Sequence, residues 1–198
     1  MIINSILDTD LYKFTTSYAY IKLFPYAMGT FQFIDRDETE YTEEFLAKLK
    51  TEIETLKHVC LRNDELQYMY KHCRFIPLVY WEWLSSFRFN PDQIEVYLDE
   101  QQHLHISITD FLYKATLYEV PILAIVSEVK NQFNNQFPDS DEVLARLTAK
   151  VELSNANKLP FSEFGTRRRF SFEVQDLVVG YLKRHASYCN GTSNCYLA

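Results

Sequence analysis

Apolar residues in the first third of the chain recur at the spacing typical of helices. From Leu11 to Ile21 they fall every three or four positions, after possible capping residues at 8–10 and before Pro25. Further amphipathic helices are predicted to begin near Thr42, Asn63 and Pro77.

Other stretches alternate between apolar and polar residues, which is typical of strands. Residues 29–35 form one, and residues 94–98 and 103–108 flank the turn-like sequence DEQQ and predict an antiparallel hairpin. His103 and His105 share the polar face of this hairpin, and no acid or nucleophile is spaced to orient them. We therefore expect both histidines to face solvent rather than to act in catalysis.

The second half of the chain alternates strands, loops and helices. Helices are predicted over 118–136, 139–157 and 171–187. Pro121 falls in the first turn of the first helix, and Ser140 or Asp141 caps the second. The sequences LPFSEFGTRRRF and SYCNGTSN each predict a strand that runs into a loop. This order is typical of a parallel α/β layer, whereas the first half is of α+β type.

The change of pattern divides the chain into two expected domains, residues 1–117 and 118–198. The expected fold class is α/β, an α+β domain followed by the start of a parallel layer. Two βα units cannot close a barrel, and two parallel strands alone make a poor sheet. We therefore interpret the chain as the N-terminal part of a longer protein.

Composition excludes several classes of protein. The 198 residues carry a formal net charge of −7, so the chain is not a bulk electrostatic binder of nucleic acid or of an anionic membrane. No apolar run is long enough for a membrane span, and no secretory signal is visible. The four cysteines form no CxxC pair and indicate free thiols in a reducing, cytoplasmic setting. A zinc site is disfavoured by spacing; it would use His58, Cys60, His72 and Cys73.

Two of the four glycines occupy matching positions in the predicted α/β layer. Gly165 and Gly191 each follow a strand, precede a helix and are followed by threonine. Loops at the carboxyl ends of parallel strands are where ligands bind. Glycine allows close approach of the backbone to a ligand, and Thr166, Thr192 and Ser193 add hydroxyl groups.

The densest basic cluster in this acidic chain is Arg167, Arg168 and Arg169. Arginine suits bidentate binding of carboxylate or phosphate, so an anion site is one interpretation. A solvated loop or structural salt bridges are the other, and the residues alone do not decide between them. If strand geometry persisted, Arg167 and Arg169 would share a face. Glu163 could assist a metal or a ribose hydroxyl, or pair with a neighbouring arginine.

Several motifs together resemble the nicotinate phosphoribosyltransferase family. They are LDTDLYKFTTSYAYIKLFP, RFIPLVYWEWLSSFRFNP, LYEVPILAIVSE, EFGTRRRFS and NGTSNCYLA. The resemblance spans nearly the whole chain, and it covers about the first half of a family member. It implies an irregular TIM-like barrel whose first two strands lie near residues 160–164 and 187–190. It also implies that nicotinate and phosphoribosyl pyrophosphate give nicotinate mononucleotide and pyrophosphate, with Mg²⁺ and ATP, in the salvage route to NAD.

The resemblance also implies site residues. Tyr12 and Phe164 would stack on the two faces of the pyridine ring, with the tyrosine supplied by the partner subunit of a homodimer. Arg167 would contact phosphate and groups near the ring. Weaker assignments to substrate binding are Thr166, Arg168, Arg169 and Asn194.

Ser193 carries a prediction of specificity. It stands where relatives that use nicotinamide have an acid, which would repel the carboxylate of nicotinate; a hydroxyl would not. Ser193 therefore favours nicotinate over nicotinamide. A relative that uses another pyridine, such as quinolinate, is a further alternative.

No catalytic residue is expected within the chain. The phosphorylatable histidine of the family would follow Ala198, in a G-T-x-x-H-E segment, and none of the five histidines present fits that motif. The loops that hold the phosphoribosyl group and Mg²⁺ would also come later. The alternative to an active enzyme is therefore an N-terminal fragment that only folds, dimerises or binds ligand.

Overall fold

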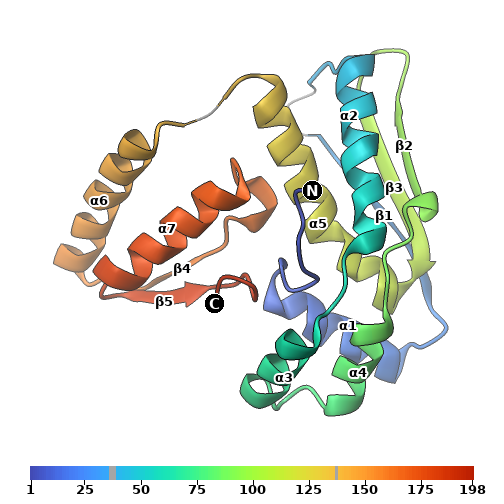
Figure 1. Ribbon diagram of the computed structural model, residues 1–198, viewed down its shortest axis with the longest axis horizontal. Coiled ribbons are helices and arrows are strands. Elements are labelled where there is room, and N and C mark those ends of the chain that lie inside the picture. Colours follow the sequence, from blue (N-terminus) through green and yellow to red (C-terminus); the bar gives the residue numbers. More distant parts are fainter. Residues whose placement is uncertain (36–38, 137) are drawn as a thin grey trace.

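The computed structural model describes residues 1–35, 39–136 and 138–198, and it shows a mixed α/β fold with two small sheets (Figure 1). The helices are α1 (Leu11–Leu23), α2 (Glu43–Glu54), α3 (Asn63–His72), α4 (Leu78–Ser86), α5 (Leu112–Phe133), α6 (Ser140–Asn157) and α7 (Phe172–His185). The strands are β1 (Met28–Gln32), β2 (Ile94–Leu98), β3 (Leu104–Phe111), β4 (Phe161–Glu163) and β5 (Cys189–Thr192). In the described ranges, no helix combines the length and apolar character that crossing a membrane requires.

The first sheet is antiparallel, with the strand order β1-β3-β2. The hairpin expected around DEQQ is confirmed, and Val96 pairs with Ile106 in its register. Strand β3 buries alternate residues from Leu104 onward, which is why the sheet has one apolar face. Helices α2 and α5 pack against this sheet (Figure 1).

The hairpin histidines are not isolated from acids as the spacing suggested. Asp99 Oδ2 lies 2.8 Å from His105 Nε2 and 3.6 Å from His103 Nδ1. The turn folds Asp99 back over the strand, which sequence spacing did not reveal. His105 still lies exposed at the surface, where its ring stacks on Tyr97. The hydrogen bond from His105 holds the pKa of Asp99 below its usual value.

Helix α5 begins six residues earlier than the sequence predicted and contains Pro121 in its interior rather than in its first turn. A proline there removes one backbone hydrogen bond, which on its own disfavours a helix. Burial outweighs this cost, because α5 packs against α1, α2, β1 and β3 and buries residues such as Leu117, Ile125 and Val129. The expected domain boundary after residue 117 falls inside this continuous helix.

Capping residues explain where three of the helices begin. Thr42 accepts a hydrogen bond from the Phe45 amide at the start of α2, as its position predicted. The cap of α6 is Asp139, not Ser140 or Asp141, because Asp139 accepts from the Asp141 amide. Ser171 caps α7 by accepting from the amide of Val174.

The second half contains the expected parallel pair, β4 and β5, covered by α7. Both strands are short, and a break in register lies between Phe161 and Glu163. The last described residues run beside the N-terminal segment before α1 (Figure 1): the Leu11 amide donates to Ser193 and the Cys195 amide donates to Thr9, each at 2.9 Å. This pairing joins the two ends of the chain at the carboxyl edge of the parallel strands.

Candidate functional site

Three segments far apart in sequence meet at the carboxyl ends of β4 and β5. They are the DTDLYK segment, the loop after β4 and the loop after β5. The Ser193 amide donates to the Glu163 carbonyl at 3.0 Å, which aligns the two loops. The sequence prediction that the two glycine loops share one edge is therefore confirmed.

The glycines serve this edge in two different ways. Gly191 has φ +113°, a conformation that residues with a side chain rarely adopt. Gly165 has an ordinary helical φ, but a Cβ there would lie 2.4 Å from Glu163 Oε1. Glu163 accepts hydrogen bonds from the Gly165 amide and from Thr192 Oγ1. Its carboxylate therefore fastens the two loops together, and it forms no ion pair with an arginine of the described chain.

The three consecutive arginines enter three different environments. Residues Thr166–Arg168 form a short 3-10 turn, so strand geometry ends before them and the condition under which Arg167 and Arg169 would share a face is not met. Arg169 is 4% exposed, Arg167 is half-buried and Arg168 is exposed. Among the described residues, the Arg168 side chain has no ion-pair partner.

Arg167 is one of four charged side chains that converge beside the N-terminal segment. Its Nη1 lies 3.2 Å from Glu119 Oε1 on α5, and its Nε lies 3.7 Å from Asp10 Oδ2. Glu119 also pairs with Lys13, whose side chain is 4% exposed. Two cations thus face two carboxylates, and the cluster is balanced in charge.

Ser193 completes this cluster from the β5 loop. Its Oγ donates to Asp10 Oδ1, the same carboxylate that faces Arg167. The hydroxyl proton of Ser193 is therefore used in the bond to Asp10, and the Ser193 oxygen can still accept a hydrogen bond. A carboxylate in place of Ser193 would lie against Asp10 as well as against any anionic ligand.

Thr166 and Asn194 are fully buried, with no exposed surface. Asn194 Nδ2 donates to Asp8 Oδ1 at 2.8 Å and to Thr166 Oγ1 at 3.0 Å. Gln175 Nε2 donates to the same Thr166 hydroxyl at 2.9 Å. These two residues, predicted to bind substrate, hold protein segments together instead of facing the surface.

Tyr12 and Phe164 both lie exposed, at 42% and 62%. The Lys13 ammonium sits 4.9 Å from the centre of the Tyr12 ring. Within the described chain, the rings of Tyr12 and Phe164 do not stack on each other or on any other ring. Both faces of each ring are therefore free of aromatic neighbours in this single subunit.

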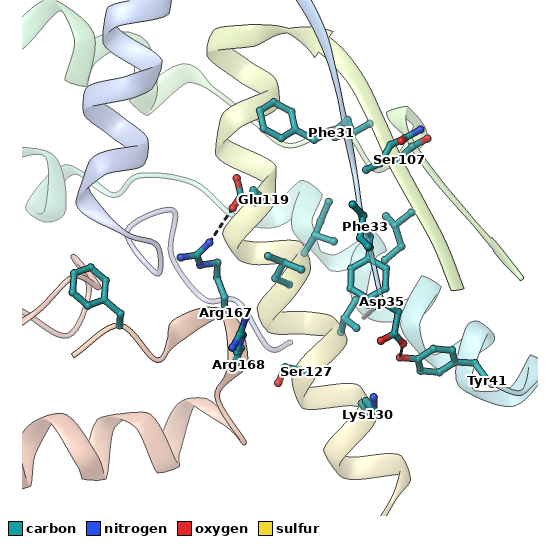
Figure 2. A pocket seen from close by; sticks show the side chains of 18 residues that line it. Phe31, Phe33, Asp35, Tyr41, Ser107, Glu119, Ser127, Lys130, Arg167 and Arg168 are labelled. Atoms are coloured by element: carbon teal, nitrogen blue, oxygen red, sulfur yellow. Dashed lines mark hydrogen bonds and ion pairs between the residues drawn. The ribbon is translucent and has the colours of Figure 1, made fainter. Parts of the chain in front are cut away.

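A cavity of about 860 Å³ opens between residues 31–35, α5 and the loop after β4. Figure 2 shows Arg167 reaching from its loop to Glu119, with Arg168 next to it. Ser127 and Lys130 lie further along the same helix, and apolar side chains such as Ile122 and Phe33 line the rest. The cavity thus joins an apolar wall to a charged rim, in which the cations of Arg167, Arg168 and Lys130 lie with the carboxylates of Asp35 and Glu119.

The acidic residues of the site do not fit a Mg²⁺ ion. Asp8 is held by Arg169 and Asn194, Asp10 by Ser193 and Arg167, and Glu119 by Lys13 and Arg167. Across the described ranges, no three His, Cys, Asp or Glu side chains cluster as metal ligands would. We therefore derive no step through a metal held by this chain.

Sequence reasoning missed Asp8, Asp10, Lys13 and Glu119. All four lie in motifs that carried the family resemblance, DTDLYK and LYEVP, but none was given a role in the site; Asp8 and Asp10 were considered only as helix caps. Only Glu119 offered a signal, as a charge within an otherwise apolar segment, because buried charges in proteins are almost always paired.

Two family models match the chain. The first, described as the nicotinate phosphoribosyltransferase (NAPRTase) N-terminal domain, covers residues 7–127. The second, described as the nicotinate phosphoribosyltransferase (NAPRTase) family, covers residues 159–198. Together they include the charged cluster and both glycine loops, but not Lys130 of the cavity wall.

Curated relatives carry the same name. The nicotinate phosphoribosyltransferase of Chromohalobacter salexigens is 32% identical over 198 residues, which are 99% of this chain and 50% of that protein. That of Methanosarcina acetivorans is 36% identical over 212 residues, covering 99% of this chain and 52% of the relative. The chain spans about half the length of the curated relatives it matches.

Solved structures agree with the sequence relatives. The crystal structure of a nicotinate phosphoribosyltransferase from Porphyromonas gingivalis is 45% identical with a TM-score of 0.96; the match covers this whole chain and 51% of that one. The enzyme of that name from Vibrio cholerae is 30% identical with a TM-score of 0.92, and 49% of it is covered.

Proposed function

This chain belongs to the nicotinate phosphoribosyltransferase family, and on that premise we propose that it takes part in making nicotinate mononucleotide and pyrophosphate from nicotinate and phosphoribosyl pyrophosphate. The observation that supports this most directly is the convergence of Arg167, Ser193 and the DTDLYK segment at one edge of the parallel strands. The product would enter the synthesis of NAD by salvage.

The reaction needs positioning and charge neutralisation more than acid–base chemistry. The pyridine nitrogen is already a nucleophile, so no general base has to activate it. The leaving pyrophosphate carries charge away from a cationic ribosyl centre, and fixed cations lower the barrier to that separation. Arg167 is half-buried, and two carboxylates fix its orientation, which suits it to bind a carboxylate or phosphate oxygen in one defined place.

An incoming anion would meet a cluster that is already balanced in charge. Glu119 occupies the position between Lys13 and Arg167, so a substrate anion that approaches Arg167 competes with this carboxylate. The competition makes binding depend on the substrate bringing further contacts, such as ring stacking. In our proposal Tyr12 and Phe164 supply that stacking, with Tyr12 coming from the second subunit of a homodimer.

Ser193 supports nicotinate as the pyridine substrate. Its hydroxyl is neutral and already donates to Asp10, so it adds no charge against the carboxylate of nicotinate. Thr166, Arg169 and Asn194 are buried, and in this proposal they support the site from behind. Arg168 is exposed at the cavity rim and would contribute positive potential to it.

The remaining parts of the proposal concern the whole protein. We assign residues 1–117 to an N-terminal domain and 118–198 to linker helices and the start of a TIM-like barrel, with β4 and β5 as its first strands. ATP coupling, a Mg²⁺ ion carried by the phosphorylated substrate and a cytoplasmic location complete the proposed activity. The phosphorylated histidine proposed for ATP coupling is not among the five histidines of this chain.

The experiment is an assay of nicotinate mononucleotide formation from nicotinate, phosphoribosyl pyrophosphate and Mg²⁺, with and without ATP. Arg167→Ala should lower kcat/KM by about 10²-fold, because a preset cation at the reacting groups is lost. Arg184→Ala is the matched control, since Arg184 lies exposed on α7 and has no ion pair within the described ranges. Equal kinetics for Arg167→Ala and the control would contradict the proposed role. No product from the unmodified chain, while nicotinate still binds, would restrict the chain to ligand binding.

A further inference from the structure

We propose that Arg169 is a positioning residue that fixes the loop carrying Arg167 against the segments carrying Asp10 and Ser193. The effect on catalysis rests on the proposed function, whereas the effect on the loops does not. Arg169 itself is 4% exposed and lies behind the site, so its guanidinium is not accessible for direct contact with a substrate anion.

The guanidinium of Arg169 joins four separate parts of the chain. Its Nη1 and Nη2 donate to the two oxygens of Asp8 at 2.7 and 2.9 Å. Its Nε donates to Glu128 on α5 at 2.6 Å. Weaker bonds reach Gln175 on α7 at 3.3 Å and the carbonyl of Ile2 at 3.4 Å. One side chain thus connects the N-terminal segment with two helices and its own loop.

Two acceptors of Arg169, Asp8 and Gln175, connect it to residues beside the site. Asp8 precedes Asp10 by two positions and also accepts from Asn194, the neighbour of Ser193. Gln175 and Asn194 both donate to Thr166, which precedes Arg167. Residues 166 and 169 are therefore anchored on either side of Arg167, and the backbone that carries Arg167 is held at both ends.

Only arginine provides the donors that this arrangement uses. Its planar guanidinium donates two parallel hydrogen bonds to Asp8 while Nε donates to Glu128. The single ammonium of a lysine cannot make this set of bonds with the same geometry. Burial alone would lower the pKa of Arg169, but the hydrogen bonds and charges of Asp8 and Glu128 raise it, so the group stays charged. Arg169→Lys therefore keeps the charge and removes the geometry.

Hydrogen exchange tests the loops directly. In Arg169→Lys we expect the amides of residues 164–168 and 192–195 to exchange at least about tenfold faster, while β3 and α5 keep their protection. Arg184→Lys is the matched control, because it makes the same substitution on the exposed side of α7. Unchanged exchange in both loops would overturn the proposal. So would a uniform rise over the whole chain, since that reports a loss of stability and no local positioning.

Milder variants keep the test informative if Arg169→Lys does not fold. Asp8→Asn and Glu128→Gln keep the shape of the acceptors. At about pH 8, above the raised pKa of Glu128, each removes one negative charge, so the same two loops should loosen to a smaller degree. Asp8→Asn should affect residues 192–195 more than Glu128→Gln does, because Asp8 accepts a hydrogen bond from Asn194 and Glu128 does not. If the two variants showed equal exchange rates in every segment, with no larger effect of Asp8→Asn on residues 192–195, the proposal would be overturned.

Kinetics then separate this inference from the proposed function. Arg169→Lys should lower kcat by up to about 10²-fold through misplacement of Arg167, with Arg184→Lys unchanged. A variant with loosened loops but normal kcat would overturn the link to catalysis. If the unmodified chain forms no product, the proposed function fails, and the exchange experiment still decides whether Arg169 positions the loops.

Discussion

At the residue scale, the balance of charge around Glu119 is what presets Arg167. Glu119 pairs with a nearly buried lysine on one side and with a half-buried arginine on the other. A buried cation that loses its counter-ion costs more than the pair as a whole contributes. The two partners of this pair should therefore respond differently to mutation.

We expect Glu119→Gln to destabilise the chain by about 2 kcal/mol, because Lys13 is then left buried without a carboxylate. Lys13→Met should cost less, since Glu119 keeps Arg167 as a partner and the methionine fills the same space. Urea unfolding of both variants measures the difference. A larger loss for Lys13→Met than for Glu119→Gln would show that Glu119 is not the counter-ion of Lys13.

Glu128 gives the buried cluster a dependence on pH. Burial raises the pKa of Glu128 to about 7, against the opposing effect of Arg169. The raised pKa means that the folded chain binds the proton of Glu128 more tightly than the unfolded chain does. The resulting stabilisation is complete below pH 4.5, the ordinary pKa of the group, and is lost as the pH rises through about 7.

Glu128→Gln stays neutral and should remove that part of the pH dependence. The free energy of unfolding of the variant should fall less than that of the unmodified chain between about pH 5 and pH 8 in urea titrations. Glu142→Gln, at an exposed pair with Arg146, should leave the profile unchanged. A profile for Glu128→Gln that is as steep as that of the unmodified chain would refute this origin.

At the element scale, the two loops after β4 and β5 depend on backbone geometry as well as on side chains. Gly191 adopts φ +113°, whereas Gly180 lies inside α7 with only the end of the flexible Arg184 side chain within 4 Å. Alanine is strained in the first conformation and favoured in the second.

We expect Gly191→Ala to destabilise the chain by about 1–3 kcal/mol and Gly180→Ala to stabilise it by about 0.5–1 kcal/mol. Thermal unfolding of the two variants compares the same chemical change in two backbone settings. Equal shifts in Tm, or a gain for Gly191→Ala, would mean that the β5 loop does not require this backbone conformation.

Sequence patterns predicted elements better than they predicted contacts. The helices at Thr42 and Asn63 and the antiparallel hairpin follow from caps and alternation, which are local properties. The start of α5 was missed because burial on several sides overrides the preference set by Pro121. The loop after β4 was predicted, but its 3-10 turn at Thr166–Arg168 was not, because the residues alone did not show how far strand geometry continues past Glu163.

At the scale of the whole molecule, the candidate site is made from both ends of the chain. The contact of Asp8 with Arg169 joins residues 161 positions apart, and that of Asn194 with Asp8 joins residues 186 apart. Periodicity carries no information on such distant pairs. Sequence alone therefore could not show that Arg169 is buried, Arg167 half-buried and Arg168 exposed. The family resemblance pointed to two loops that the structure brings together, and only the structure shows which of their side chains are accessible.

The central claim is that Arg167 forms the accessible cation of a nicotinate site at this edge. Isothermal titration of nicotinate into the purified chain, with nicotinamide in parallel, tests it most directly. We expect the unmodified chain to bind nicotinate more tightly than nicotinamide, Arg167→Ala to weaken nicotinate binding at least about tenfold, and Arg184→Ala to bind as the unmodified chain does. Nicotinate binding that is absent from the unmodified chain, or undiminished in Arg167→Ala, would contradict the account.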